Sequence, residues 1–162
     1  MSVVEMMTWL QHRPFAVEIA ESTWLFPALE ALHVLALTFV VGSVAMMDLR
    51  LLGIGRDRPV SEVLERSLPW TWSAFAVALV AGGLLFSSKA LTYYEDLPFR
   101  IKFACMALAG LNMLVFHLVT ARRMADWERG TPPLAARMAG GISIVLWISI
   151  VAAGRWIGFT TN

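Results

Sequence analysis

The sequence has little cysteine and little charge, and it shows no export signal; each absence removes a class of protein. Cys105 is the only cysteine among 162 residues, so the chain cannot form an internal disulfide or a thiolate-rich metal site. Charged residues make up only 15% of the chain, against roughly 25% in soluble proteins. The net charge of +1 identifies no partner, and we expect none that is a nucleic acid. The N-terminal segment lacks a basic stretch followed by an apolar core, so we expect no cleaved signal peptide.

Apolar residues fill most of the chain. They make up 58% of it, and the mean hydropathy is +0.66. A helix needs roughly 17–25 residues to cross the hydrocarbon of a bilayer. Four windows reach or approach that length: Trp24–Met47, Trp70–Ser88, Phe103–Ala121 and Met138–Phe159. The sequence therefore predicts an all-α integral membrane four-helix bundle that occupies residues 1–162 as a single domain, with no soluble domain.

Short polar segments precede and separate these windows. At the N-terminus, apolar residues recur at helical spacing beside polar ones (Val3, Met6, Met7 and Leu10 beside Glu5, Gln11 and Arg13). This pattern predicts a short helix lying in the membrane interface. The segments 52–59, 93–98 and 129–133 contain Gly or Pro and interrupt helices. Because these loops are short, consecutive spans should be antiparallel neighbours.

Basic residues are distributed unevenly between the two ends of the predicted bundle. Eight of the 13 flank one end (Arg50, Arg56, Arg58, Arg66, Arg122, Arg123, Arg129 and Arg137), and five lie at the other (Arg13, Lys89, Arg100, Lys102 and Arg155). Loops rich in Lys and Arg remain in the cytoplasm. We therefore expect a multi-pass protein of the bacterial inner membrane with both termini in the periplasm.

Ionisable groups inside the spans are the most informative residues, since each costs about 2.5–3.5 kcal/mol at the middle of a membrane helix. Glu30 lies about 9 Å and His33 about 14 Å inward from Trp24, at about 1.5 Å per residue. Their spacing places both on one helix face. Basic residues of the other spans lie at the same end (Lys89, Arg100, Lys102 and Arg155), and the long side chain of Lys102 can reach towards the level of His33. These depths predict one polar site in the periplasmic half, built from all four spans.

A haem b fits this set of residues, because haem needs an axial ligand, an apolar slot and cations for its propionates. We predict His33 as an axial ligand and Lys102 or His12 as the second, with Glu30 orienting His33 through a hydrogen bond. His117 lies about 22 Å deeper than Lys102, which argues against it as a ligand. The propionates would meet the remaining basic residues (Arg155, Arg100 and Lys89), and six aromatic residues could wall the slot (Phe26, Phe39, Trp72, Phe75, Trp147 and Trp156).

Two segments resemble HemJ-type protoporphyrinogen oxidases. His33 lies in EALHVLALTFVVGSVAMMDLRLL, which is similar to the first helix of that family. Lys102 lies at the head of PFRIKFACMALAGLNMLVFH, which is similar to a later helix of the same family. The resemblance implies that His33 and Lys102 are a haem-linked pair. The whole chain more closely resembles an uncharacterised bacterial family of four-helix membrane proteins, and more loosely the CopD-like copper-resistance membrane domain.

The predicted function is redox chemistry, either electron transfer with a quinone or a periplasmic protein, or oxidation of a porphyrin or quinone. A second interpretation is transport of copper or protons through His33, Cys105, Glu30 and nearby methionines. A third is a non-catalytic assembly subunit of a membrane complex, whose intramembrane charges bind a neighbouring chain. Separately, Glu30 could form a structural ion pair with Lys102 or Arg155. In the simplest interpretation, His33 is a core histidine bonded to Glu30 or to a backbone carbonyl. A homo-oligomer would suit a thin bundle of 18.0 kDa.

Overall fold

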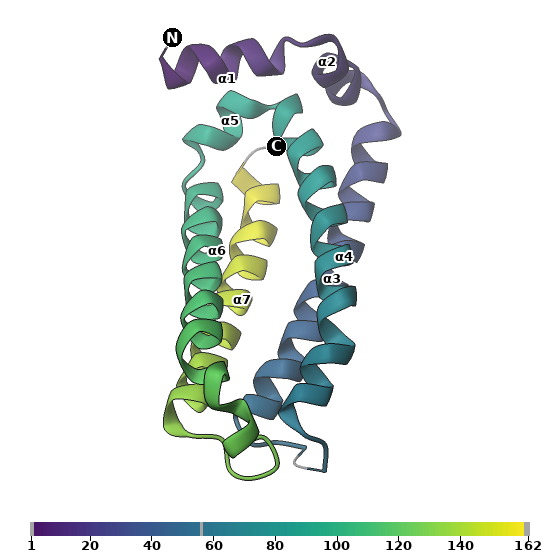
Figure 1. Ribbon diagram of the computed structural model, residues 1–162. Coiled ribbons are helices and arrows are strands. Elements are labelled where there is room, and N and C mark those ends of the chain that lie inside the picture. The colour runs from purple at the N-terminus through teal and green to yellow at the C-terminus, as the bar shows by residue number, and fades with distance from the viewer. Residues whose placement is uncertain (1, 56, 161–162) are drawn as a thin grey trace.

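Four long helices form the body of the computed structural model, which describes residues 2–55 and 57–160 (Figure 1). They are α3 (Leu25–Leu51), α4 (Val60–Ser88), α6 (Leu97–Val115) and α7 (Leu134–Thr160). A π-helical turn, η1 (Phe116–Thr120), and a 3₁₀ turn, η2 (Ala121–Asp126), extend α6 into a span of 30 residues. All four are long and apolar enough to cross a membrane. The prediction of an all-α four-helix membrane bundle is confirmed.

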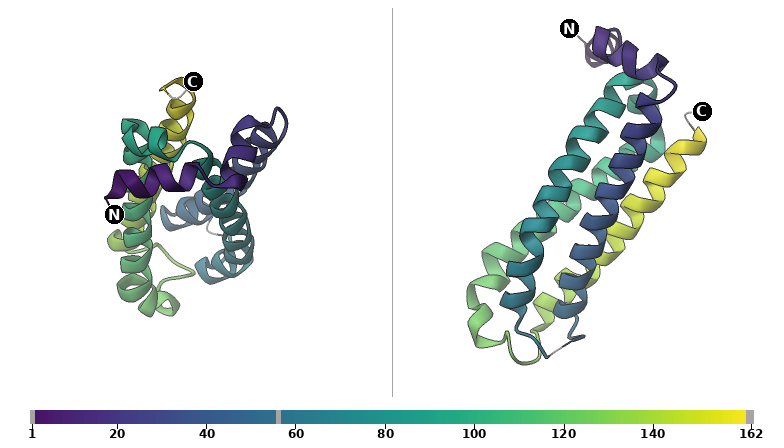
Figure 2. Two further views of the ribbon diagram at one scale, coloured as in Figure 1. Left: turned by 90° about the horizontal axis from the view of Figure 1, so that it is seen from above. Right: turned by 90° about the vertical axis from the view of Figure 1, so that its right-hand side faces the viewer.

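Three short helices cover one end of the bundle. α1 (Val3–Gln11) begins with a capping box, in which the side chains of Ser2 and Glu5 each accept a hydrogen bond from the other residue's backbone N–H. Figures 1 and 2 show α1 lying across the helix ends, with α5 (Ala90–Glu95) beneath it. The Leu91 N–H donates to the Gln11 side chain at 3.2 Å and joins the two helices. α2 (Pro14–Glu21), which has no counterpart among the predicted elements, packs beside α4.

We call this covered end the terminal end, because α1 and the last turn of α7 both lie there, and the opposite end the loop end (Figure 1). At the loop end, Arg50 ties the two connecting loops together. Its side chain donates to the carbonyl oxygens of Arg58 at 2.8 Å and Glu128 at 2.7 Å. The Ser61 hydroxyl also donates to the Glu128 carboxylate. These bonds close the loop end around a buried arginine.

Two helices extend beyond the predicted spans because they include charged residues or a proline that hydropathy windows exclude. α3 continues past the predicted end at Met47 to Leu51 and buries Asp48. α4 begins at Val60 and carries Pro69 inside the helix. A proline removes one backbone donor and bends a helix, but the remaining hydrogen bonds can continue on either side.

The last two spans also begin earlier than predicted, at helix-start signals. The Asp96 side chain accepts from the Phe99 N–H at 3.0 Å and so caps α6, which begins at Leu97. α7 begins at Leu134, directly after a pair of prolines, rather than at Met138. Both starts add polar or small residues to the ends of apolar helices.

The long helices pack as two antiparallel pairs. α3 packs along α4, α6 packs along α7, and the pairs meet where α3 contacts α7. In the described part of the chain, α4 and α6 form no comparable interface, and their ribbons stand apart in Figure 1. The bundle is therefore an open arc of helices in the order α4, α3, α7, α6.

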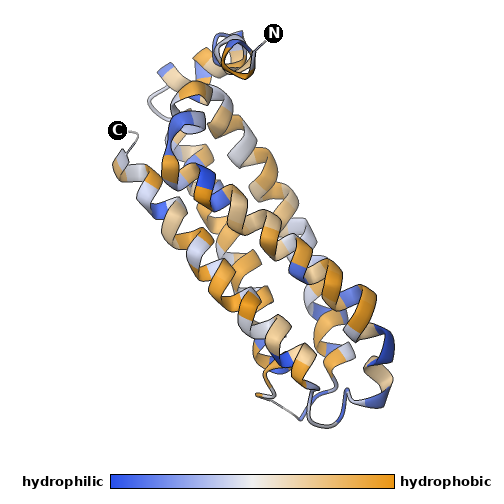
Figure 3. Cartoon of the chain, turned by 90° about the vertical axis from the view of Figure 1, so that its left-hand side faces the viewer, coloured by the Kyte–Doolittle hydropathy of each residue, from blue (hydrophilic) through white to orange (hydrophobic). Residues whose placement is uncertain are grey.

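The outer faces of the helices carry large apolar side chains. Figure 3 shows hydrophobic residues along the length of the bundle and hydrophilic ones gathered towards its ends. Representative side chains on each span are more than half exposed in the isolated chain (Val34 57%, Leu79 61%, Val119 67% and Val145 63%). A soluble protein rarely exposes so extended an apolar surface. The chain is a multi-pass membrane protein, and these faces contact the lipid bilayer.

Candidate functional site

His33, on α3, lies against the backbone of α4. Its ring atom Nδ1 is 2.8 Å from the carbonyl oxygen of Ala78. Because a carbonyl oxygen can only accept, Nδ1 carries the proton and donates it, and the neutral ring keeps its lone pair on Nε2. Nε2 has no hydrogen-bond partner among the residues that the structure describes. Histidines that bind metals through Nε2 commonly use this tautomer, with Nδ1–H fixed by a backbone carbonyl.

Gly82 allows the ring to approach α4 so closely. A Cβ at Gly82 would lie 2.7 Å from His33 Cε1 and 3.0 Å from Nδ1. The imidazole thus occupies the space that a side chain at position 82 would need. Gly82 is four residues after Ala78, so the glycine and the accepting carbonyl lie on the same face of α4.

Lys102 lies on α6, in the other helix pair, and its side chain runs against α7. Its Nζ is 3.5 Å from the position that a Cβ on Gly154 would take. The side chain is partly buried, and its charge acts on the imidazole of His33, so the two groups lie within electrostatic range. No described carboxylate forms an ion pair with this ammonium. His33 and Lys102 thus belong to opposite helix pairs and lie near enough for their charges to interact.

Glu30 forms no hydrogen bond or ion pair with His33 in the described structure. The Ala78 carbonyl occupies the hydrogen-bonding position predicted for Glu30, so the ring is oriented by backbone. Glu30 is exposed and faces Tyr93 of α5. Burial, followed by the negative charges of Glu30 and Asp96, raises the pKa of Tyr93, which keeps this phenol neutral. The structural ion pair considered for Glu30 is not formed among the described residues.

The other basic residues lie at the terminal end, and none of them forms a hydrogen bond with His33 in the described structure. Lys89 is partly buried, with Nζ 5.8 Å from the centroid of the Phe26 ring. Arg100 and Arg155 are exposed, and the guanidinium carbon of Arg155 is 5.2 Å from the centroid of the Phe159 ring. Exposed cations at one end of a membrane bundle can meet carboxylates or lipid headgroups.

The remaining histidines lie away from this level. His12 is exposed on α1, and its Nδ1–H donates to the Thr8 carbonyl at 2.6 Å. His117 lies on the π-helical turn near the loop end, and its Nδ1–H donates to the Met113 carbonyl at 2.9 Å. The depth argument had placed His117 apart from Lys102, and the helix path has it about 22 Å further along the same span at 1.5 Å per residue.

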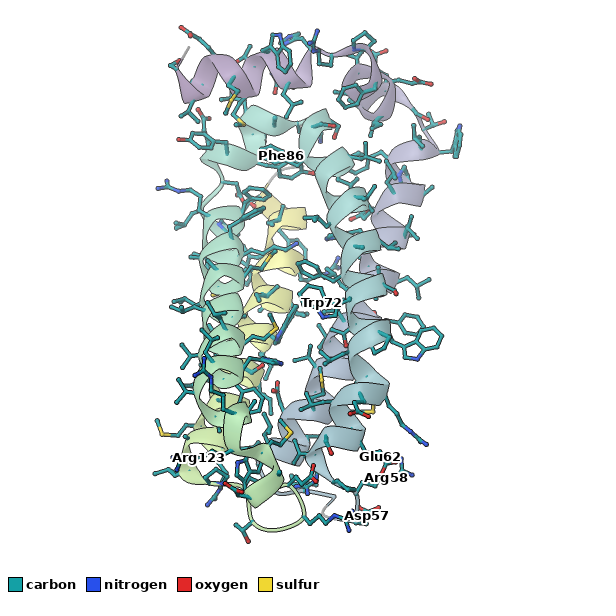
Figure 4. The ribbon with its side chains drawn as sticks, viewed as in Figure 1. Asp57, Arg58, Glu62, Trp72, Phe86 and Arg123 are labelled. Carbon is teal, nitrogen blue, oxygen red and sulfur yellow. The ribbon has the colours of Figure 1, made fainter. Side chains whose placement is uncertain are left out.

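An aromatic cluster, which the sequence patterns did not predict, lies one helical turn beyond Gly82 and His33 in the direction of the terminal end. Phe86 (labelled in Figure 4) stacks on Phe99 and Tyr93, with ring centroids 5.3 Å and 6.3 Å away, and Phe103 is 4.8 Å from Phe99. The cluster joins α4, α5 and α6, so it forms only once α5 folds back over the bundle. Its residues had been left out of the predicted slot.

A cavity of about 260 Å³ lies between the helix pairs in the half nearer the loop end. Three predicted wall residues, Trp72, Phe75 and Trp147, line it, and Figure 4 shows Trp72 between the pairs. Phe39 and Trp156 do not line it; they are 59% and 63% exposed, and Trp72 itself is 53% exposed. Neither His33 nor Lys102 lines this cavity. Only part of the predicted slot thus lines a cavity, and this cavity lies nearer the loop end than His33.

Asp48 is a buried acid in the cavity wall that the sequence analysis missed. It is 5% exposed, and Oδ2 of its carboxyl has no partner in the described structure. Ser143 on α7 lines the same cavity. The predicted span ended at Met47, which placed Asp48 in a loop. The available signal was that no turn residue occurs before Gly53, so the helix could continue through the acid.

No group of three or more His, Cys, Asp or Glu side chains within residues 2–55 and 57–160 could hold a bare metal ion. Haem differs, since its ring supplies four nitrogen ligands and the protein supplies one or two. Among the described residues, His33 and Lys102 are groups that could supply such ligands.

The fold and this arrangement define a multi-pass α-helical membrane protein with a histidine and a lysine in its spans. The chain belongs to the DUF6644 family, a family of unknown function that matches residues 25–160. The match takes in the four long helices and leaves out α1 and α2. No curated protein matches the chain, and no solved structure does.

Proposed function

We propose that the protein is a b-type haem-binding redox protein of the bacterial inner membrane, with His33 as an axial ligand of the iron. One observation carries the proposal: the proton of His33 is held on Nδ1 by the Ala78 carbonyl, so Nε2 keeps its lone pair inside a membrane span. A histidine that served packing alone would leave this nitrogen without a partner, which is costly in an apolar environment.

Lys102 supports the same function from the opposite helix pair. An ammonium inside a span costs about 2.5–3.5 kcal/mol when nothing compensates it. No described carboxylate pairs with Lys102, while its charge reaches the imidazole of His33. As a second ligand the amine would be neutral, which removes this cost. In a five-coordinate site, Lys102 would instead lie beside the open face.

Neighbouring residues of the chain fix the position of the His33 ring. Ala78 fixes the tautomer and the plane of the His33 ring, and Gly82 provides the space for it. When bound, haem would supply one-electron transfer. Cations for its carboxylates are available at the terminal end (Lys89, Arg100 and Arg155). The aromatic cluster around Phe99 would exclude water from that side.

Loop charge indicates which side of the membrane the site would face, and therefore which redox partners it could meet. The loop end carries most of the basic residues, so the terminal end would face the periplasm. The haem would then lie in the periplasmic half, and its partner would be a membrane quinone or a periplasmic redox protein. Oxidation of a porphyrin-like substrate would use the same site.

Optical absorption of the purified protein, with iron and porphyrin analysis after haem-replete expression, tests the proposal. We expect a Soret band that His33→Ala abolishes and that free imidazole restores, because the removed ring leaves space beside Gly82. Lys102→Met should shift the band or change its spin state. His117→Ala is the matched control and should leave the spectrum unchanged. A wild-type protein without a Soret band, or a band insensitive to His33→Ala, would refute haem binding at this site.

A further inference from the structure

The cavity near the loop end presents hydrogen-bond acceptors whose partners are missing. Asp48 is its most buried polar residue, at 5% exposure, and Oδ2 of its carboxyl has no partner in the described structure. An acceptor left unpaired in the interior costs about 1–3 kcal/mol. This atom therefore marks a place where a ligand could donate.

Two further polar residues of the cavity wall already donate an N–H group to a backbone carbonyl. Asn112 donates through Nδ2 to the Ala139 carbonyl at 2.9 Å, which leaves its Oδ1 as an acceptor. His117 donates through Nδ1 to the Met113 carbonyl, which leaves the lone pair of Nε2. Both residues line the cavity together with Asp48. The wall thus offers three acceptors and favours a ligand that brings hydrogen-bond donors.

The rest of the wall is apolar and aromatic. Trp72 and Phe75 meet edge to face, with centroids 6.1 Å apart and planes at 88°, and Trp147 lines the same space. A Cβ on Gly110 would meet nothing within 4 Å, so the wall also has room on α6. No Lys or Arg lines the cavity. A flat, apolar ring is the shape and chemistry that such a wall accommodates.

The cavity lies between α4 and α6, the two long helices that do not pack along each other in the described chain. A molecule held there could leave an apolar tail between these helices and in the lipid. The volume of about 260 Å³ is slightly below the roughly 300 Å³ of the smallest typical ligand sites. It would therefore take a headgroup rather than a whole long-chain molecule.

We propose that this cavity binds a hydroquinone headgroup, an aromatic diol whose hydroxyls donate to Asp48 and to Asn112 or His117, with its apolar chain in the bilayer. The diol supplies donors where the wall has acceptors, and its ring matches the aromatic side chains. The site involves neither His33 nor Lys102 and does not require haem, although it would provide a place for the quinone partner of the proposed function.

Binding of three matched compounds to the purified protein in lipid nanodiscs tests this, with empty nanodiscs to correct for partition. The probes are a short-chain alkyl hydroquinone, its dimethyl ether and an alkylamine of similar size. We expect the diol to bind at least tenfold more tightly than the ether, a difference of about 1.4 kcal/mol. Asp48→Leu should remove this preference. Asp126→Leu, which changes an exposed acid at the same end, should retain it.

A second variant, Gly110→Leu, tests the same cavity without changing Asp48. Its side chain would extend into the space beside Gly110, so diol binding should fall at least tenfold while absorbance of the His33 site stays unchanged. Equal affinity of wild type for the diol and the ether would overturn the proposal, since the cavity would then be an apolar filler site. Tighter binding of the amine, lost in Asp48→Asn, would overturn it in favour of a cation site. Diol binding that survives Gly110→Leu would also overturn it, because the ligand would lie elsewhere.

Discussion

Replacing Gly82 with alanine tests whether the imidazole of His33 lies where the structure places it. The new methyl group would be 2.7 Å from Cε1 and 3.0 Å from Nδ1, so the ring must move. Movement breaks the hydrogen bond to the Ala78 carbonyl, worth about 0.5–1.5 kcal/mol. Overpacking adds about 1–3 kcal/mol. The next residue supplies the control, because a Cβ on Gly83 would meet nothing within 4 Å.

Both substitutions gain about 0.8–1 kcal/mol from the higher helix propensity of alanine. This gain cancels when the two variants are compared, so Gly82→Ala should have a free energy of unfolding roughly 2–4 kcal/mol lower than Gly83→Ala. Reversible unfolding in mixed micelles, titrated with a denaturing detergent, measures this difference.

A double-mutant cycle then assigns the loss to the histidine. In a His33→Ala background the methyl group has no ring to displace, so Gly82→Ala should match Gly83→Ala within about 0.5 kcal/mol. Equal stabilities of the two variants in the wild-type background would refute the placement of the ring. A large loss at Gly82 that persists without His33 would show that another contact limits the space there.

Two further pairs of variants test the packing of the helices and the closure of the loop end. Gly140→Ala would bring a Cβ within 2.9 Å of the Asp48 backbone oxygen, so α3 and α7 must separate, and we expect a loss of about 1–3 kcal/mol in the same unfolding assay. Gly141→Ala, whose Cβ meets only Leu52 at 3.9 Å, should be neutral or stabilising, and equal effects would contradict the close approach. Arg50→Met removes donors to the Arg58 and Glu128 carbonyls and should cost about 3 kcal/mol and speed proteolysis of both loops. Arg66→Met, which breaks an exposed pair with Glu62 at 3.7 Å, should change stability by less than about 1 kcal/mol, and similar proteolysis of the two variants would argue against the arginine tie.

The sequence was informative about depth because a membrane helix converts residue number into distance. His33 and Lys102 were expected at one level from a rise of about 1.5 Å per residue, and the structure places them within electrostatic range. Partners across helices could not be inferred in this way. Glu30 shares a face with His33, yet the proton of the ring goes to Ala78, 45 residues away.

Boundaries were the other limit of the sequence patterns. The first hydropathy window ended at Met47, directly before a charged residue, so it placed Asp48 outside the membrane helix. The structure buries this residue because Gly140 on α7 lets the two backbones approach: a Cβ there would lie 2.9 Å from the Asp48 oxygen. A glycine that permits contact with a distant helix has no local signature that distinguishes it from one that faces lipid.

By itself, the sequence determined the number of spans, their antiparallel order and the approximate depth of the polar groups inside the predicted spans, since all three depend on local hydrophobicity and helix geometry. Only the tertiary structure decided that α4 and α6 stay apart, that a cavity with an unpaired carboxyl oxygen lies between the pairs, and that a backbone carbonyl orients His33. These features depend on which helix faces meet, and such contacts join residues too distant in the chain for any local pattern to specify.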